Sequence, residues 1–203
     1  KNQFEKEFKF EIIFSEKFSY AIFPIPHFRF KDVRFVSKER DLAQIELVKV
    51  YLTFSKFLDK NKMNIQNVVI KKAKFDFFKE DLKNLVNFFN RKINDKKITL
   101  LNSKIFIKDE DEDIYSIISI NKSQSIYNKI EDLNNLDVDG EIFNNSFKLK
   151  LKNDFSDSRS NLDLVFNKLN KKFINDIDFK NKKVKGSLSY FDAKKIRYSL
   201  YIS

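Results

Sequence analysis

The fold of this chain is decided by the stretch Phe23–Phe35, which reads FPIPHFRFKDVRF. It holds both prolines and the only histidine of the protein. Proline fixes φ and has no amide hydrogen to give to a sheet, so the segment begins at a sheet edge or crossing. Beyond Pro26, apolar and basic residues alternate with the period of a β-strand that has one apolar face.

The alternation changes phase within this stretch. Phe28 and Phe30 share one face of a strand, whereas Val33 and Phe35 have the opposite parity. One extra residue near Lys31–Asp32, in a β-bulge or a tight bend, would bring all four side chains onto the same face. The sequence therefore predicts a bulged strand with a continuous apolar side.

One-sided alternation continues along most of the chain and predicts about ten to twelve strands with no βαβ rhythm. We therefore expect a mainly β protein, built as a long curved meander of antiparallel strands. The segment Phe173–Phe179 is ambiguous between a strand and a short helix. In the two strands after the first stretch, the predicted apolar positions are Val48, Val50, Leu52 and Phe54, then Ile65, Val69, Ala73, Phe75 and Phe77.

One segment has helical spacing instead. Its apolar residues are Leu82, Leu85, Val86, Phe89 and Ile93. This spacing predicts one amphipathic helix around residues 80–93, with Glu80 and Asp81 favouring its amino end. One helix covers about 10 Å of sheet width, so it cannot cover the apolar face of ten strands. That face must close on itself as a barrel or sandwich, or meet something outside this chain.

The composition restricts the class of protein. At 203 residues, with 42% apolar and 15% aromatic residues, the chain supports a folded core. The formal charge of +11 raises nucleic-acid or anionic-membrane binding, but the lysines are spread over nearly every segment, and a solvated polar face explains most of them. With two glycines, turns must be built from Asn, Asp, Ser and Lys. No cysteine is present for disulfides or thiol chemistry.

No residue pattern predicts an enzyme, a cofactor or a metal site. His27 has no Cys to join it and is expected to be a hydrogen-bonded histidine at a strand edge. The acidic run Asp109–Asp113 resembles a calcium loop in charge alone, because Ile114 stands where an EF-hand needs glycine, so we expect a solvated turn. The interleaving in Phe28–Phe30 is typical of single-strand nucleic-acid binders, but alternation puts Phe and Arg on opposite faces, so we expect no nucleic-acid partner.

The order of elements is informative: a Pro-x-Pro, alternating apolar residues, an Asp-Val pair, strands, a helix and further strands. The segments concerned are Pro24–Phe28, Asp32–Val33, Ile45–Leu58, Ile65–Val68, Asp81–Phe89 and Ile98–Ile105. Over residues 18–150 this order resembles the amino-terminal region of AsmA-like proteins. That family is periplasmic, is anchored in the inner membrane by an amino-terminal helix, and belongs with TamB to the bridge-like lipid-transfer proteins.

The resemblance implies an open, taco-shaped β-groove that carries phospholipid acyl chains between the inner and outer membranes. Residues 1–203 would then be a single module of a longer, membrane-anchored periplasmic chain, since no apolar run here approaches the ~20 residues of a membrane helix. Membrane contact would be made by a segment outside this chain. The scarcity of glycine and the modest length depart from the family pattern.

We expect the groove to bind acyl chains through apolar contact alone, at about 0.8 kcal/mol per buried methylene. The predicted lining residues are Phe28, Phe30, Val33, Phe35, Val50, Leu52, Phe54, Phe75 and Phe77. The alternative is a structural β-domain with a closed core that assists outer-membrane assembly through protein contacts. A third class, a basic nucleic-acid binder, would gather Lys and Arg on one face. The first two differ in whether the apolar strand faces line an open groove or meet each other.

Overall fold

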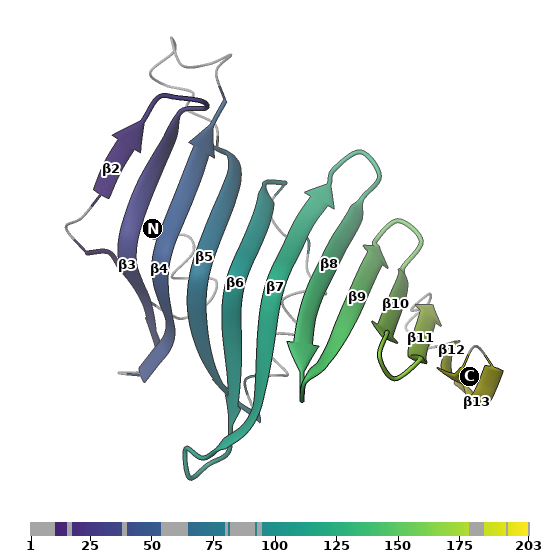
Figure 1. Ribbon diagram of the computed structural model, residues 1–203. Helices are drawn as coiled ribbons and strands as arrows, with labels where there is room; N and C mark the ends of the chain where they lie inside the picture. Colours follow the sequence, from purple (N-terminus) through teal and green to yellow (C-terminus); the bar gives the residue numbers. More distant parts are fainter. Residues whose placement is uncertain are drawn as a thin grey trace.

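The computed structural model of the protein describes residues 11–15, 18–37, 40–53, 65–79, 81, 92, 95–178, 185–193 and 195–202. They form one long, curved and open sheet of 13 strands, with β2 and β13 at opposite ends (Figure 1). The strands are β1 (Glu11–Ile13), β2 (Phe18–Ala21), β3 (His27–Ser37), β4 (Arg40–Leu52), β5 (Ile65–Phe78), β6 (Lys97–Lys108), β7 (Ile114–Asn128), β8 (Leu133–Ile142), β9 (Asn145–Asp154), β10 (Arg159–Phe166), β11 (Lys171–Asp178), β12 (Lys185–Asp192) and β13 (Lys195–Ile202). The mainly β prediction is confirmed, and of the ambiguous segment Phe173–Phe179 the described residues 173–178 belong to strand β11.

Strands that follow one another in the sequence are neighbours in the sheet, except that β1 and β2 both pair with β3. The predicted meander is wrong at one place, because β5 and β6 run parallel, from Asn67 opposite Lys97 to Phe78 opposite Lys108. All other described pairs are antiparallel. A parallel pair needs a long connection, and residues 79–96 provide it.

The amphipathic helix predicted around residues 80–93 lies almost entirely outside the described residues. Lys79 and Asp81 have helical backbone, and the Asp81 carboxylate accepts the amide hydrogen of Phe78 at 2.9 Å. The described ranges contain no complete helix, so this helix stays a prediction.

A line of residues at which the alternation of apolar and polar positions changes phase crosses five neighbouring strands, and we call it the crease. At the crease the pairing of β3 and β4 passes from Lys31–Leu47 directly to Val33–Ile45. The backbone has positive φ at three of these positions, which are the ones in β3, β5 and β6. The phase change predicted near Lys31–Asp32 is therefore confirmed as a bend with positive φ at Asp32, without a register shift between β3 and β4 at that point, and similar phase changes extend across much of the sheet. The crease consists of Asp32 (φ 51°), Glu46, Lys72 (φ 53°), Asn102 (φ 48°) and Asn121.

The core of the protein lies beside the crease. Val33, Ala43, Ile45 and Ala73 are each at most 2% exposed and pack together, whereas the crease residues themselves are exposed. Two of these four side chains are alanines, which fit the inside of a bend. The core therefore gathers small and branched side chains next to the crease.

Ser103 fills a gap in the pairing of β5 with β6. The partner residues of this pair are interrupted at the crease, between Lys71–Leu101 and Lys74–Lys104, while the register stays the same. The Ser103 hydroxyl, 2% exposed, accepts the amide hydrogen of Ala73 and donates to the Leu101 carbonyl, both at 3.0 Å. The Ser103 side chain thus supplies hydrogen bonds that the backbones of β5 and β6 do not make with each other at the crease.

The turns contain the residue types expected in a chain so poor in glycine. Every described residue with positive φ is a non-glycine, and Asn and Asp make up five of the ten. In the hairpin between β8 and β9, Phe143 and Asn144 have φ of 49° and 60°. Gly140 is used for close approach instead, since a Cβ there would lie 2.5 Å from the Ser119 carbonyl oxygen and 2.9 Å from the Phe147 ring.

Candidate functional site: the apolar face of the sheet

The candidate site is one face of the sheet, which we call the apolar face. Residues that pair across strands point to the same side, so the strand registers define its members. One row runs from Phe28 through Val50 and Val68 to Ile98. A second row, over the far half of the sheet, joins Val138, Leu149 and Leu164 to Phe173.

The structure brings the predicted lining residues together. Registers put Phe28, Phe30, Val33, Phe35 and Val50 on the apolar face, and they put Phe75 and Phe77 there too. The rings of Phe28 and Phe30 are 6.4 Å apart between centroids, and those of Phe75 and Phe77 are 5.9 Å apart. Leu52 continues the alternation of β4 and is buried, while Phe54 lies outside the described residues.

One facing prediction is wrong. Val69 was expected on the apolar face, but it pairs with Lys49 on the opposite face. The crease residue Lys72 shifts the phase of β5, so that Val68 and Ile70 hold the apolar positions before it.

Much of the apolar face is only half covered. Across the described strands, extensive packing occurs between sheet neighbours and not with a second layer of strands. The accessible surface of the chain is 14230 Å², against about 10,000 Å² for a compact protein of 24.3 kDa. Most apolar side chains of β8–β12 on this face are half-buried. The sheet therefore leaves apolar area available for contact.

An aromatic ladder extends the apolar face to the end of the sheet. Five rings on five consecutive strands follow one another with centroid separations of 6.1, 6.4, 5.0 and 6.2 Å. Such spacings are typical of attractive aromatic pairs. The sequence analysis did not single these residues out, although their alternation in each strand was visible. The ladder consists of Phe147, Phe166, Phe173, Tyr190 and Tyr198.

Small polar residues interrupt the apolar face on β7. Ser123 pairs with Leu100 and Val138, and Ser125 pairs with Ile98 and Leu136. On the other side of the crease, Ile118 and Ile120 of β7 keep the face apolar.

The opposite face of the sheet, which we call the polar face, alternates charge over β8–β11. Lys150 of β9 lies between Asp137 of β8 and Asp163 of β10. Asp163 in turn pairs with Lys172 of β11 at 2.7 Å. Opposite charges in neighbouring strands stabilise a given register, so this part of the polar face specifies strand order.

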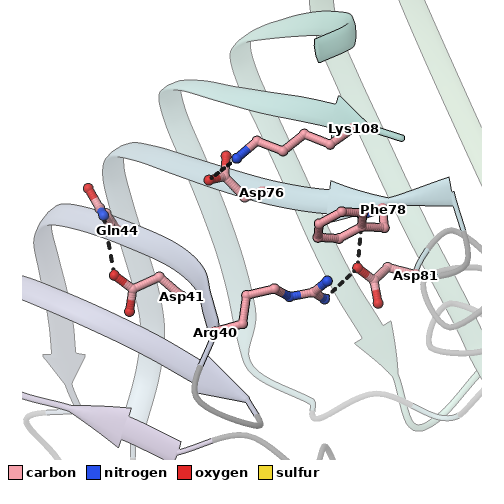
Figure 2. Close-up of polar contacts among 7 residues, drawn as sticks. All are labelled: Arg40, Asp41, Gln44, Asp76, Phe78, Asp81 and Lys108. Atoms are coloured by element: carbon pink, nitrogen blue, oxygen red, sulfur yellow. Dashed lines mark hydrogen bonds and ion pairs between the residues drawn. The ribbon is translucent and has the colours of Figure 1, made fainter. Parts of the chain in front are cut away.

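Near the ends of β4–β6, the polar face carries a cluster of contacts (Figure 2). The Arg40 guanidinium lies 4.3 Å from the centre of the Phe78 ring and donates to Asp81 at 2.8 Å. Lys108 donates to Asp76 at 3.1 Å and so joins β6 to β5. These contacts position the chain where it leaves β5; the cluster holds no nucleophile or paired acid and base.

His27 is a structural residue, as predicted. It is 2% exposed, and its ring stacks on Tyr51 at 4.8 Å. Nδ1 lies 2.7 Å from the Ile25 carbonyl oxygen, and Arg29 Nε donates to Nε2 at 2.8 Å. Both ring nitrogens are therefore used within the fold.

The acidic run forms a turn between β6 and β7, as predicted. The Asp109 carboxylate accepts the amide hydrogens of Asp111 at 3.1 Å and Asp113 at 2.9 Å. No group of three or more potential metal ligands occurs within the described ranges. Nor does any helix in the described part of the chain have the length and hydropathy needed to cross a membrane.

A second turn, between β7 and β8, is held by Asp132. Its carboxylate accepts hydrogen bonds from Lys92 and Tyr127. The Lys92 bond is the main cause that holds the pKa of Asp132 below its usual value, and the same bond raises the pKa of Lys92.

Comparison with known proteins adds no relative. No family model matches the sequence, and no curated protein is significantly similar to it.

Proposed function

We propose that this protein is a non-enzymatic lipid-binding and lipid-transfer module whose apolar face carries phospholipid acyl chains. The observation that carries the proposal is the half-covered apolar face, which extends from β3 to β13 in an open sheet. In this proposal the curved, open sheet forms a taco-like groove. Residues 1–203 act as one module.

The size of the face suits long hydrocarbon chains. From β3 to β13 there are ten strand-to-strand steps, or about 48 Å. Acyl chains need no hydrogen bonds, and each methylene removed from water contributes about 0.8 kcal/mol. Rows of Leu, Ile, Val and Phe therefore bind them without specific polar contacts.

The resemblance to AsmA-like proteins supports the proposed lipid-transfer function. In this proposal the protein acts in the periplasm, is anchored in the inner membrane through a segment outside these residues, and serves outer-membrane biogenesis. The alternative, a β-domain that assists outer-membrane assembly through protein contacts, was expected to have a closed core. An open sheet favours the lipid-binding function over that alternative.

Two adjacent residues of β10 provide a matched test. Leu164 lies on the apolar face between Leu149 and Phe173, while Val165 lies on the polar face between Lys148 and Lys172. Each substitution by Asp replaces one half-buried aliphatic side chain with one carboxylate, but only Leu164→Asp puts the charge on the apolar face.

The assay is uptake of a fluorescent fatty-acid probe, with native mass spectrometry of the purified protein for co-purified phospholipid. We expect Leu164→Asp to lower probe affinity at least tenfold and Val165→Asp to leave it nearly unchanged, with both proteins retaining β-type circular dichroism. Absence of phospholipid and of uptake in the unmodified protein, or equal losses in the two folded variants, would refute the proposal.

A further inference from the structure

The polar face changes character in the other half of the sheet. Over β3–β7 it carries a group of cations that we call the basic patch. They come from segments far apart in the sequence, and the strand registers align them on one side. The patch consists of Arg29, Lys49, Lys71, Lys74, Lys104 and Lys122.

Within the patch, like charges face each other directly. Arg29 pairs with Lys49, and Lys74 pairs with Lys104. The pKa of Lys49 is lowered, first by burial and then by the charges of Lys71 and Arg29. Like charges opposite each other destabilise a sheet. Over β8–β11, by contrast, charged residues face residues of opposite charge. Repulsion between facing cations is therefore tolerated in the patch but avoided in that part of the sheet.

Most lysines of the patch have no acid as a register partner, although Lys122 lies opposite Asp139 of β8. In the described part of the chain, Lys49, Lys71, Lys74, Lys104 and Lys122 form no ion pair. The last three are exposed. The nearby acids Glu46 and Asp76 are paired with other lysines. A net positive surface is therefore presented to the solvent.

An apolar tip adjoins this surface. The loop between β2 and β3 leaves Ile22 67%, Phe23 86% and Ile25 41% exposed, and it leads directly through His27 to Arg29. Large apolar side chains next to cations are typical of protein segments that bind at the interface of a membrane.

We propose that the basic patch binds the surface of an anionic lipid bilayer, with the tip at Ile22–Ile25 inserted between the headgroups. This function belongs to the face opposite the acyl-binding one and does not depend on it. Positive charges near an acidic leaflet attract it additively. The patch thus fits a broad, laminar array of negative headgroups.

A nucleic-acid partner fits these residues less well. The uncharged residues between the cations include Leu47, Leu101 and Gln44 and present no aromatic ring, whereas single-strand binders stack bases on aromatic rings. The ring that Arg29 contacts is that of His27, which is 2% exposed and stacked on Tyr51. A broad sheet face also does not enter the major groove of a duplex, which admits a helix or a two-stranded ribbon.

The test compares two triple variants with the same change of net charge. The patch variant is Lys74→Gln, Lys104→Gln and Lys122→Gln. The control, on β9, is Lys148→Gln, Lys150→Gln and Lys152→Gln, whose lysines are also exposed. Binding is measured by co-sedimentation with phosphatidylcholine vesicles, with and without phosphatidylglycerol, at low and high salt.

We expect binding only to vesicles that contain phosphatidylglycerol, and its loss at high salt. One cation contributes about fivefold, so the patch variant should bind on the order of 100-fold more weakly, and the control within a few-fold of the unmodified protein. Acyl-probe uptake by the patch variant should be unchanged, which separates this proposal from the lipid-transfer one. Equal effects of the two variants, equal binding to neutral vesicles, or tighter binding of a single-stranded oligonucleotide than of acidic vesicles would overturn it.

Discussion

Replacing Ser103 with alanine tests whether a hydroxyl holds the crease together. Ser103 Oγ accepts the amide hydrogen of Ala73 and donates to the Leu101 carbonyl, both at 3.0 Å. Ser103 is 2% exposed and Ala73 1% exposed, so water cannot replace the hydroxyl. The Ser103→Ala variant would leave a buried backbone amide without an acceptor.

The expected loss follows from that amide. A buried polar group left unpaired costs about 1–3 kcal/mol. With a urea dependence of about 2 kcal/mol per molar, the midpoint of unfolding should fall by roughly 0.5–1.5 M. The measurement is urea unfolding followed by circular dichroism, together with hydrogen exchange of the Ala73 amide, which should lose its protection.

Ser123 offers a control on the same face. It is half-buried on β7, and its hydroxyl makes no hydrogen bond within the described residues. Ser123→Ala should therefore change the free energy of unfolding by no more than about 0.5 kcal/mol. Equal stability of the two variants, or an Ala73 amide that stays protected in Ser103→Ala, would show that the hydroxyl does not support the crease.

Three further predictions concern stability. Gly140→Ala should destabilise the protein by about 1–3 kcal/mol in urea unfolding, because the new methyl meets the Ser119 carbonyl and the Phe147 ring, and a stable variant would contradict this close approach. Lys72→Val should be less stable than Lys72→Gly by about 1–2 kcal/mol, because Lys72 has φ of 53°; equal midpoints would argue against this backbone. The pKa of Asp132 is lowered, so its contribution to stability is present above its unfolded value near 3.8 and is lost as the pH falls through the lower folded value. Thermal unfolding of Asp132→Asn should therefore decline less steeply below pH 4 than that of the unmodified protein, and parallel declines would count against this linkage.

The phase change in β3 could be predicted from the sequence, whereas the phase changes in the other strands of the crease could not. The phase change between Phe30 and Val33 is flanked by aromatic residues, so the sequence shows clearly that the apolar positions shift by one residue. In β5 the same change occurs at Lys72, where a lysine with positive φ is uncommon and nothing local marks it. If the alternation is assumed to continue without interruption through Lys72, Val69 is assigned to the wrong face of the sheet.

The direction of β6 was equally hidden. A period of two is the same for parallel and antiparallel strands, so the alternation in Ile98–Ile107 does not reveal its partner's direction. The basic patch escaped sequence analysis for a related reason. Lys49, Lys74 and Lys122 are scattered along the chain, and only the registers of β4–β7 collect them on one face. Whether the sheet is open or closed depends on the total curvature of all its strands, so it cannot be predicted from any single segment.

The single parallel pair also has a consequence for how the chain folds. On both sides of the parallel pair, each strand pairs with strands that are close in sequence. The segments β1–β5 and β6–β13 can therefore each form by stepwise addition of hairpins. Joining β5 to β6 requires closure of the longer connection through residues 79–96, which costs more chain entropy. Two chains cut within that connection would each keep their hairpins and should reassemble by complementation, with Ser103 at the seam.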